Sequence, residues 1–355
     1  MRRNDYEPDA VSPPGATLLD LLEERGMSQA ELANRTDRPL KTINEIVKGK
    51  AAITPETAIQ LERVFGAPAS FWNNREAQYR EFLARRVHDA QLEKVAARIR
   101  EVPTRAMEKL EWIPVEKTRA KKLERVLSFF GVASIDALEN RRHDARFRQS
   151  SAFEANPIAV GAWLRKGHLD ADQIHCAPFD ETKFRQVLAK ARRLCGEMPD
   201  DFAARLVQLC ASAGVALVFV KELPGTHLSG AARWLSPTKA LIQLSVRHGS
   251  DDHFWFTFFH EAAHLLKHAR RKVYIDADGG IQNDEEAEAN QFAADVLIPP
   301  AAWKGFVEAR AFTKRSIRLF ASQVTIAPGV VVGRLQHERR VAFSFAHDLK
   351  RKISF

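Results

Sequence analysis

The chain has 355 residues and a mass of 40.0 kDa, more than twice the roughly 150 residues of a typical domain, so two or three domains are expected. Apolar residues make up 45% and charged residues 28%, and the longest purely apolar run, VALVFV, is far shorter than a membrane span, which argues against a transmembrane or a wholly disordered protein. The 54 Lys and Arg against 45 Asp and Glu give a net charge of +9, which favours polyanionic partners.

The N-terminal sequence and the cysteines indicate where the protein works. MRRNDYEPDAVSPPG has acids and prolines where a signal peptide would need an apolar stretch, so residues 1–14 are expected to form a flexible lead. Cys176, Cys195 and Cys210 are odd in number and have no CxxC spacing, which argues against a disulfide framework and a cysteine zinc site. We therefore expect a cytoplasmic protein with reduced thiols and no membrane partner.

Four short helices are predicted within a first domain at 15–74. The first, TLLDLLEERG at 17–26, has leucines at helical spacing and ends in glycine. The second begins at Ser28, three residues before a glutamate, which is typical of a capping box. The third ends at Gly49, and the fourth starts with Thr54 as N-cap followed by a proline.

The second and third of these helices have the order and spacing of a helix-turn-helix unit. A positioning helix at 28–36 and a tight turn precede a recognition helix at about 40–48, which fits the DNA major groove. Lys41 and Asn44 are the side chains best suited to base edges. The residues expected to contact DNA are Gln29, Leu40, Lys41, Thr42, Asn44, Lys48 and Lys50, with Gln29, Lys48 and Lys50 on phosphates. The alternative is a small helical protein-interaction domain.

From about residue 13 to 85 the chain resembles the HigA-like addiction-module antitoxins, a branch of the Xre-type helix-turn-helix proteins. The resemblance is carried by PGATLLDLLEERGMSQAELANRTDRPLKTINEIVKGK and by the following TPETAIQLERVFGAPASFW. It implies a homodimer that binds double-stranded operator DNA and represses its own operon, often beside the gene of a cognate toxin.

Residues 75–204 are expected to form a helical connector or middle region. Between 75 and 125 there are 14 basic and 9 acidic residues, which favours a solvated connector and leaves a nucleic-acid surface as the alternative. At 215–220 a β-branched run predicts a buried strand, and SGAARWLSPTKALIQLS predicts a hairpin with SPTK as its turn. The whole chain is therefore expected to be mainly α with a small β-sheet, an α+β protein, with a last domain at 205–355.

His260, Glu261 and His264 form an HExxH motif, which predicts a zinc site. FHEAAHLLKH contains no Pro or Gly to break a helix, so the two imidazoles share one face, separated by about 6 Å of helix rise. Glu261 adjoins the metal, where a carboxylate can take a proton from water. His268 is too far along the helix to bind the same ion and is expected either in solvent or behind a ligand. We expect one Zn²⁺ per chain.

A catalytic zinc needs a third protein ligand, and the acidic helix at 284–298 offers three candidates. Glu285 fits a role at the helix N-terminus, and Glu288 lies on a polar face. Glu286 shares its face with small residues suited to packing against another helix, so it is the expected ligand. Asn290, one turn further on, can hydrogen-bond a ligating imidazole.

HExxH followed by EAEANQFAADVLIP resembles the ImmA/IrrE family of metallopeptidases, over about residues 205–340. The resemblance implies a zincin-like domain, similar to the gluzincins, in which His260, His264 and Glu286 bind zinc and Glu261 is catalytic. Near the C-terminus, IRLFASQVTIAPGVVVGRLQHE has the outline of a second helix-turn-helix-like segment, or of ordinary packed helices.

Two functions remain open from the sequence. The chain is either a DNA-binding transcription regulator whose zinc endopeptidase cleaves a regulatory protein, or a HigA-like antitoxin and repressor whose zinc domain is only a sensor or scaffold. An intact HExxH with a correctly phased third ligand favours retained chemistry. A substrate strand is expected to pair along the hairpin strand at 240–244, since proteases commonly bind extended peptides.

Overall fold

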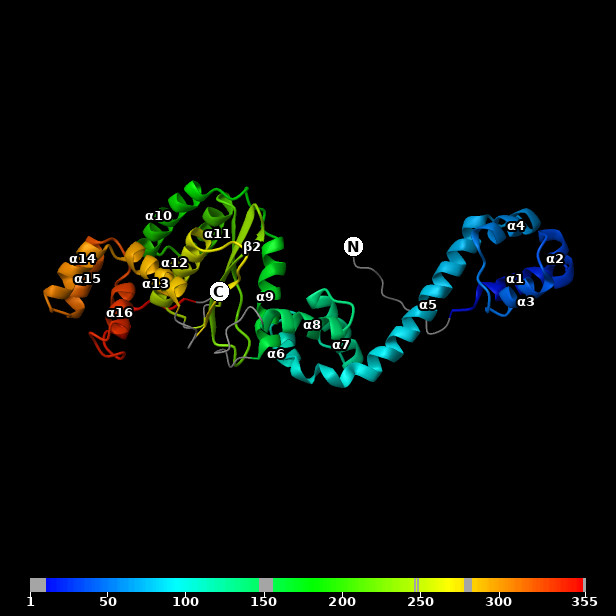
Figure 1. Cartoon of the computed structure of the whole chain (residues 1–355), viewed down its shortest axis with the longest axis horizontal. Helices are drawn as coiled ribbons and strands as arrows, with labels where there is room; N and C mark the ends of the chain where they lie inside the picture. The colour runs from blue at the N-terminus through cyan, green and yellow to red at the C-terminus, as the bar shows by residue number, and fades with distance from the viewer. Residues whose placement is uncertain (1–10, 147–155, 246, 248, 278–282, 354–355) are drawn as a thin grey trace. The chain divides into compact units, whose positions relative to one another are not determined.

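The computed structural model describes residues 11–146, 156–245, 247, 249–277 and 283–353. The first ten residues of the expected lead lie outside the described residues. The chain divides into two compact units, Met1–Ala97 and Arg98–Phe355. Both are drawn in Figure 1.

The first unit is helical, and its helices enclose one apolar core. Thr54 accepts a hydrogen bond from the backbone of Thr57 at the start of the fourth helix, and Gly66, with φ of 82°, ends it, as the sequence predicts. The core includes Phe65 and the fully buried Trp72. The last helix continues through the expected domain boundary after residue 74. The helices are α1 (Pro14–Glu24), α2 (Gln29–Thr36), α3 (Leu40–Val47), α4 (Pro55–Phe65) and α5 (Ala69–Val95).

Helices also make up the first part of the second unit. Two of its side chains fix α9 against the sheet: Trp163 donates a hydrogen bond from Nε1 to the carbonyl of Val220 (2.8 Å), and Gln243 donates one from Nε2 to the carbonyl of Trp163 (2.7 Å). The elements are η1 (Ala96–Glu101), α6 (Thr104–Lys109), α7 (Arg119–Phe130), α8 (Ile135–Arg146), α9 (Pro157–Asp172), α10 (Glu181–Glu197) and α11 (Phe202–Ser212).

A mixed four-stranded sheet follows, in the order β1-β3-β2-β4. Its strands are β1 (Val215–Phe219), β2 (Leu228–Ser236), β3 (Lys239–Leu244) and β4 (Tyr274–Ala277). β1 is parallel to β3, and β2 is antiparallel to both β3 and β4. The predicted strand and hairpin are confirmed.

The position of β3 corrects one expectation about the substrate. Ile242 of β3 lies opposite Leu217 on one side and Ala232 on the other, so both edges of β3 already carry backbone hydrogen bonds. Pairing of a substrate along 240–244 is therefore wrong. β4 pairs with β2, and no other strand of the described residues lies along its second edge.

Of the remaining helices, α12 packs against the sheet, α13 and α16 pack on α12, and α15 packs on α16 (Figure 1). α12 is almost wholly buried because it carries Phe254, Trp255, Phe258 and Phe259 as well as the HExxH residues. The elements are α12 (Asp251–Lys267), α13 (Asp284–Leu297), α14 (Pro300–Glu308), α15 (Lys314–Gln323), α16 (Pro328–His337) and η2 (His347–Leu349). The α+β class predicted from the sequence is confirmed.

α15 and α16 both pack into the core of the second unit, and most of α16 is buried. They are bent by 114° relative to each other. However, α16 buries Val330, Val331, Val332 and Leu335 against the core, so it has no free face for a groove. No single described helix has both the length and the apolar composition of a membrane span. α15 and α16 meet both criteria only when they are taken together, as this bent pair.

Candidate metal centre and nucleic-acid interface

The HExxH histidines and Glu286 converge on one point. His260 and His264 in α12 are both 2% exposed, and their Nε2 atoms are 3.0 Å apart. Glu286, from α13, has Oε2 3.1 Å from Nε2 of His260 and Oε1 3.5 Å from Nε2 of His264. One ligand atom from each residue lies within 4.8 Å of the other two. The packing of α13 on α12 creates this cluster.

The cluster suits zinc in both donor type and spacing. Two nitrogens bound to zinc at about 2.0 Å in tetrahedral geometry are about 3.3 Å apart, close to the separation seen here. Two imidazoles and one carboxylate also leave a fourth position open, as catalytic zinc sites require. The side chains of His260, His264 and Glu286 therefore fit the expected metal.

Hydrogen bonds behind the histidines orient their rings. Nδ1 of His260 lies 3.0 Å from Oδ1 of Asn290; an amide oxygen can only accept, so Nδ1 carries the proton and Nε2 is free to bind a metal. Nδ1 of His264 lies 2.9 Å from Nδ1 of His268, whose Nε2 lies 3.1 Å from a carboxylate oxygen of Glu288. His268 is thus behind a ligand and not in solvent.

Two aromatic contacts at the site were not anticipated from the sequence. The ring of Tyr274, in β4, stacks on His264 with centroids 4.2 Å apart. The ring of Phe256 lies over that of His260 with centroids 6.3 Å apart and an angle of 30° between the ring planes. Helical phase could have identified Phe256, which precedes His260 by four positions. Nothing local marks Tyr274, because its contact depends on how β4 joins the sheet.

Glu261 occupies an unusual environment. Its side chain is fully buried, and neither carboxylate oxygen has a hydrogen-bond partner among the described residues. Burial raises the pKa of Glu261 well above 4.5, and the nearby charges of Asp276 and Glu286 raise it further. A buried polar atom without a hydrogen-bond partner lowers the stability of the fold, so stability does not explain the position of this carboxyl group.

The other groups of the cluster respond to one another. Burial opposes ionisation of Glu286, but hydrogen bonds from both imidazoles lower its pKa to about 2. Burial lowers the pKa of His264, whereas at His260 the bond to Glu286 and the charge of Asp276 outweigh burial and raise the pKa. The negative charges of Glu286 and Asp276 thus both act on His260 and Glu261, and a bound cation would stabilise this arrangement.

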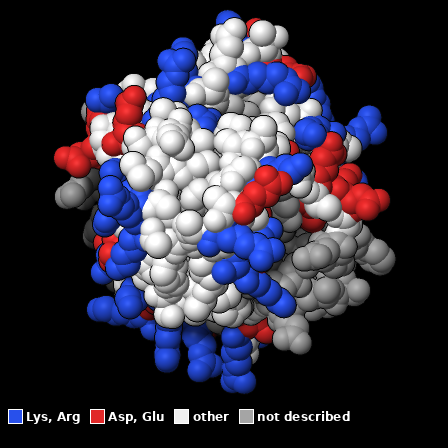
Figure 2. All heavy atoms as spheres, turned by 90° about the vertical axis from the view of Figure 1, so that its left-hand side faces the viewer, with Lys and Arg blue, Asp and Glu red and all other residues white. Residues whose placement is uncertain are grey.

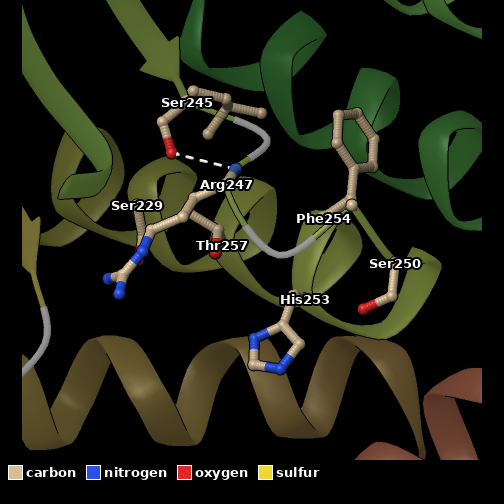
Figure 3. Close-up of a pocket in the computed structure, with 9 residues that line it drawn as sticks. Ser229, Ser245, Arg247, Ser250, His253, Phe254 and Thr257 are labelled. Carbon is tan, nitrogen blue, oxygen red and sulfur yellow. Dashed lines mark hydrogen bonds between the residues drawn. The ribbon is translucent and has the colours of Figure 1, made fainter. Parts of the chain in front are cut away.

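Two hollows lie near α12. Figure 3 shows a recess where the end of β3 meets β2 and α12: the backbone of Arg247 donates to Oγ of Ser245, and His253 points away from the serines. Its volume of about 20 Å³ holds about one water, so it is no substrate site. A larger cavity of about 520 Å³ between α12, α13 and α16 includes Phe256 and Asn290, and is large enough for a bulky side chain or small molecule.

The predicted DNA-contacting residues cluster on α2, α3 and the turn after α3. Lys41, Lys48 and Lys50 are exposed, and Leu40 is 45% exposed. Among the others, Gln29, Thr42 and Asn44 are half-buried. Asn44 donates from Nδ2 to the carbonyl of Leu40 (3.1 Å).

Fold and motif together define a helix-turn-helix domain joined to a metallopeptidase-like domain. Residues 18–72 match the helix-turn-helix family model, and residues 216–311 match that of the IrrE N-terminal-like domain, which is classed with the peptidases. The chain belongs to the helix-turn-helix family and carries an IrrE N-terminal-like domain in its second unit. Both resemblances expected from the motifs, Xre-type and ImmA/IrrE, are confirmed.

Individual relatives match a limited part of the chain. Virulence-associated protein A of Dichelobacter nodosus is 42% identical over 68 residues, 19% of this chain and 67% of that protein. The uncharacterized HTH-type transcriptional regulator YddM of Escherichia coli K12 is 36% identical over 61 residues, 17% of this chain and 65% of that protein. The chain thus spans about two thirds of the length of these relatives. The structure of a HigA-family addiction module antidote protein from Coxiella burnetii is 29% identical, covering 25% of this chain and 89% of that one, with a TM-score of 0.21.

Proposed function

We propose that the chain is a DNA-binding transcription regulator whose second unit is a zinc-dependent endopeptidase that cleaves a regulatory protein. The observation that carries the peptidase proposal is the position of Glu261. Its buried carboxylate has no hydrogen-bond partner among the described residues, and it lies close enough to Glu286, one of three side chains suited to zinc, for the charge of Glu286 to raise its pKa. A site that only sensed or scaffolded a metal would have no need of such a group.

The residues of the cluster have two roles in the proposed peptide hydrolysis: three of them hold the metal, and Glu261 transfers a proton. His260, His264 and Glu286 would hold a zinc ion, which would supply Lewis-acid chemistry for water and the peptide carbonyl. Glu261 accepts the proton that water releases as its oxygen attacks the carbonyl carbon, and passes that proton to the amine nitrogen as the C–N bond breaks. A raised pKa of Glu261 suits both proton transfers, because the carboxyl group exchanges protons most readily when its pKa lies closer to neutral pH.

The edge of β4 along which no other described strand pairs is the proposed docking place for the substrate backbone. β4 carries Tyr274, which stacks on His264, so a peptide paired along this strand would run past the ligands. Backbone hydrogen bonds to a sheet edge give affinity that does not depend on sequence. This mode suits an extended segment of a protein substrate.

For the first unit, we propose that α3 enters the major groove of an operator as part of a homodimer. Lys41 and Asn44 would read bases, and the exposed Lys48 and Lys50 would hold phosphates. Repression of the chain's own operon follows from binding there. A cognate toxin is the alternative protein partner, if the second unit is not a peptidase.

The experiment compares new protein N-termini in cells that express the parent chain or Glu261→Gln. Termini found with the parent alone identify the substrate and support the proposal. Zinc analysis of both purified chains is the control, since Glu261 is not a proposed ligand. Identical sets of termini from two zinc-loaded chains, under stress and without it, would leave the sensor or antitoxin function as the better account.

A further inference from the structure

The net charge of the chain is concentrated at its C-terminal end. Residues 1–97, which include the helix-turn-helix domain, have 14 Lys and Arg against 15 Asp and Glu, a net charge of −1. Residues 98–299 add a net charge of +2. Residues 300–355 contain 11 Lys and Arg against three Asp and Glu, a net charge of +8 out of the total of +9.

Most of these C-terminal cations lie at the surface. The exposed ones are Lys304, Arg310, Lys314, Arg315, Arg318, Arg339, Arg340, Arg351 and Lys352. The three acids are already paired with cations of the same segment, such as Asp348 with Lys314 at 2.7 Å. Arg310, Arg315 and Arg318 have no carboxylate partner within 4 Å among the described residues. Figure 2 shows this side of the molecule, where Lys and Arg groups surround a broad uncharged area.

The first turn of α15 carries positive charge, where a helix favours negative charge. Its first turn holds Lys314 and Arg315 and no acid, whereas α12 and α13 begin with acids. Cations at a helix N-terminus are unfavourable, because the free backbone N–H groups there already make that end positive. Arg318 follows one turn later on the same face. Fold stability therefore does not account for these cations.

We propose that the exposed cations of α14, α15 and the C-terminal segment form a second DNA contact, which binds phosphates of the duplex that the helix-turn-helix domain holds. This inference rests on the DNA-binding part of the proposed function and not on the peptidase. Binding to DNA of any sequence depends on cations that neutralise phosphates, and the first unit, with a net charge of −1, has no surplus of cations beyond local ones such as Lys48 and Lys50.

The surface contributes affinity without reading sequence. The exposed cations lie on α14, on α15, between these two helices and in the segment after α16, whereas most of α16 itself is buried. Arg and Lys side chains on phosphates carry no base information. The second contact should therefore strengthen binding to operator and random DNA alike.

The test uses the full chain and a salt series of duplex binding, followed by fluorescence anisotropy on a short labelled duplex of mixed sequence. Three proteins are compared: the parent, Arg315→Ala/Arg318→Ala, and the control Arg205→Ala/Lys221→Ala, which removes two exposed cations of the same unit from outside this surface. The slope of log K against log salt should become shallower by about 1.8 in the first variant, at about 0.9 per lost phosphate contact, and stay unchanged in the control.

The outcomes separate this inference from the proposed function. If the parent binds no duplex, both fail. If the parent binds and both double variants keep its slope, the second contact is overturned while the helix-turn-helix proposal stands. A parallel arm uses phosphatidylserine vesicles: if they retain the parent and not Arg315→Ala/Arg318→Ala, while duplex binding is equal, the surface is a membrane contact and the DNA inference is wrong.

Discussion

Gly230 of β2 lies directly against Glu261 of α12: a Cβ atom added at position 230 would be 2.4 Å from Oε1 of that carboxylate. The same Cβ would be 2.8 Å from Cγ2 of Thr257, on the preceding turn of α12. The strand and the helix approach so closely only because residue 230 has no side chain. This contact fixes where the carboxylate of Glu261 can sit.

Gly230→Ala should therefore displace the carboxylate of Glu261 while leaving the histidines and Glu286 in place. A shift of about 1 Å in a catalytic group costs about 10²-fold in rate, so proteolysis of the identified substrate should fall by about that factor at full zinc content. Gly305→Ala in α14 is the matched control, since an added Cβ there meets nothing within 4 Å. Full activity of Gly230→Ala would show that the position of Glu261 is not critical.

Glu286→Ala should lose stoichiometric zinc, because among the described residues Glu286 is the carboxylate that pairs with both proposed imidazole ligands. Glu285→Ala is the control: that side chain pairs with Lys272 instead and should not affect binding. Zinc per chain is measured by elemental analysis after dialysis against a weak chelator. Zinc retained by Glu286→Ala would reject this ligand and turn attention to Asp276.

Substitutions in α3 should separate base reading from phosphate contact. Lys41→Ala and Asn44→Ala are expected to lower the preference for operator over random DNA, each by about 1–3 kcal/mol. Lys48→Ala should instead weaken binding to both DNAs equally and reduce the salt slope by about 1. Titration of each variant with the two duplexes checks this. Equal losses on both duplexes from all three changes would contradict the placement of α3.

Because of Asp251, the free energy of unfolding should decrease as the pH rises from about 4 to about 6. Burial and the charge of Asp252 raise the pKa of Asp251 from 3.8 to about 6. In that window the folded chain keeps a proton that the unfolded chain has released, so the free energy of unfolding decreases with pH, by up to about 3 kcal/mol for the full shift.

Asp251→Asn removes this titration, so its stability relative to the parent should increase from pH 4 to pH 6. Urea unfolding of both chains, with chelator present to remove metal effects, gives the difference at each pH. Parallel stability curves would mean that Asp251 ionises in the folded chain as readily as in the unfolded one.

Much of the site could be predicted because its signals are local. HExxH fixes two histidines on one helical face, and the phase of the following acidic helix distinguishes Glu286 from Glu288. The convergence of these side chains then depends only on α13 packing against α12. Glycine within a strand also signals a close approach, and Gly230 could have been singled out on that ground.

The features of the fold and the site that the sequence did not predict depend on pairings between distant segments. β4 is only four residues long and has no hairpin partner next to it in sequence, so neither the sheet edge nor the stacking of Tyr274 on His264 could be read from local pattern. For the same reason the alternation of the hairpin predicted β3 but not its parallel pairing with β1. That pairing is what excludes a substrate from β3.

Derepression in living cells measures whether hydrolysis at Glu261 controls transcription. Glu261→Gln keeps the size of the side chain and removes the base, a change that typically costs about 10²- to 10⁴-fold in rate. With a reporter behind the promoter of the chain's own operon, the parent should derepress when the inducing stress arrives. The zinc-loaded Glu261→Gln chain should stay locked in repression. Derepression of that variant to the level of the parent would contradict the account and leave the zinc site a sensor or scaffold.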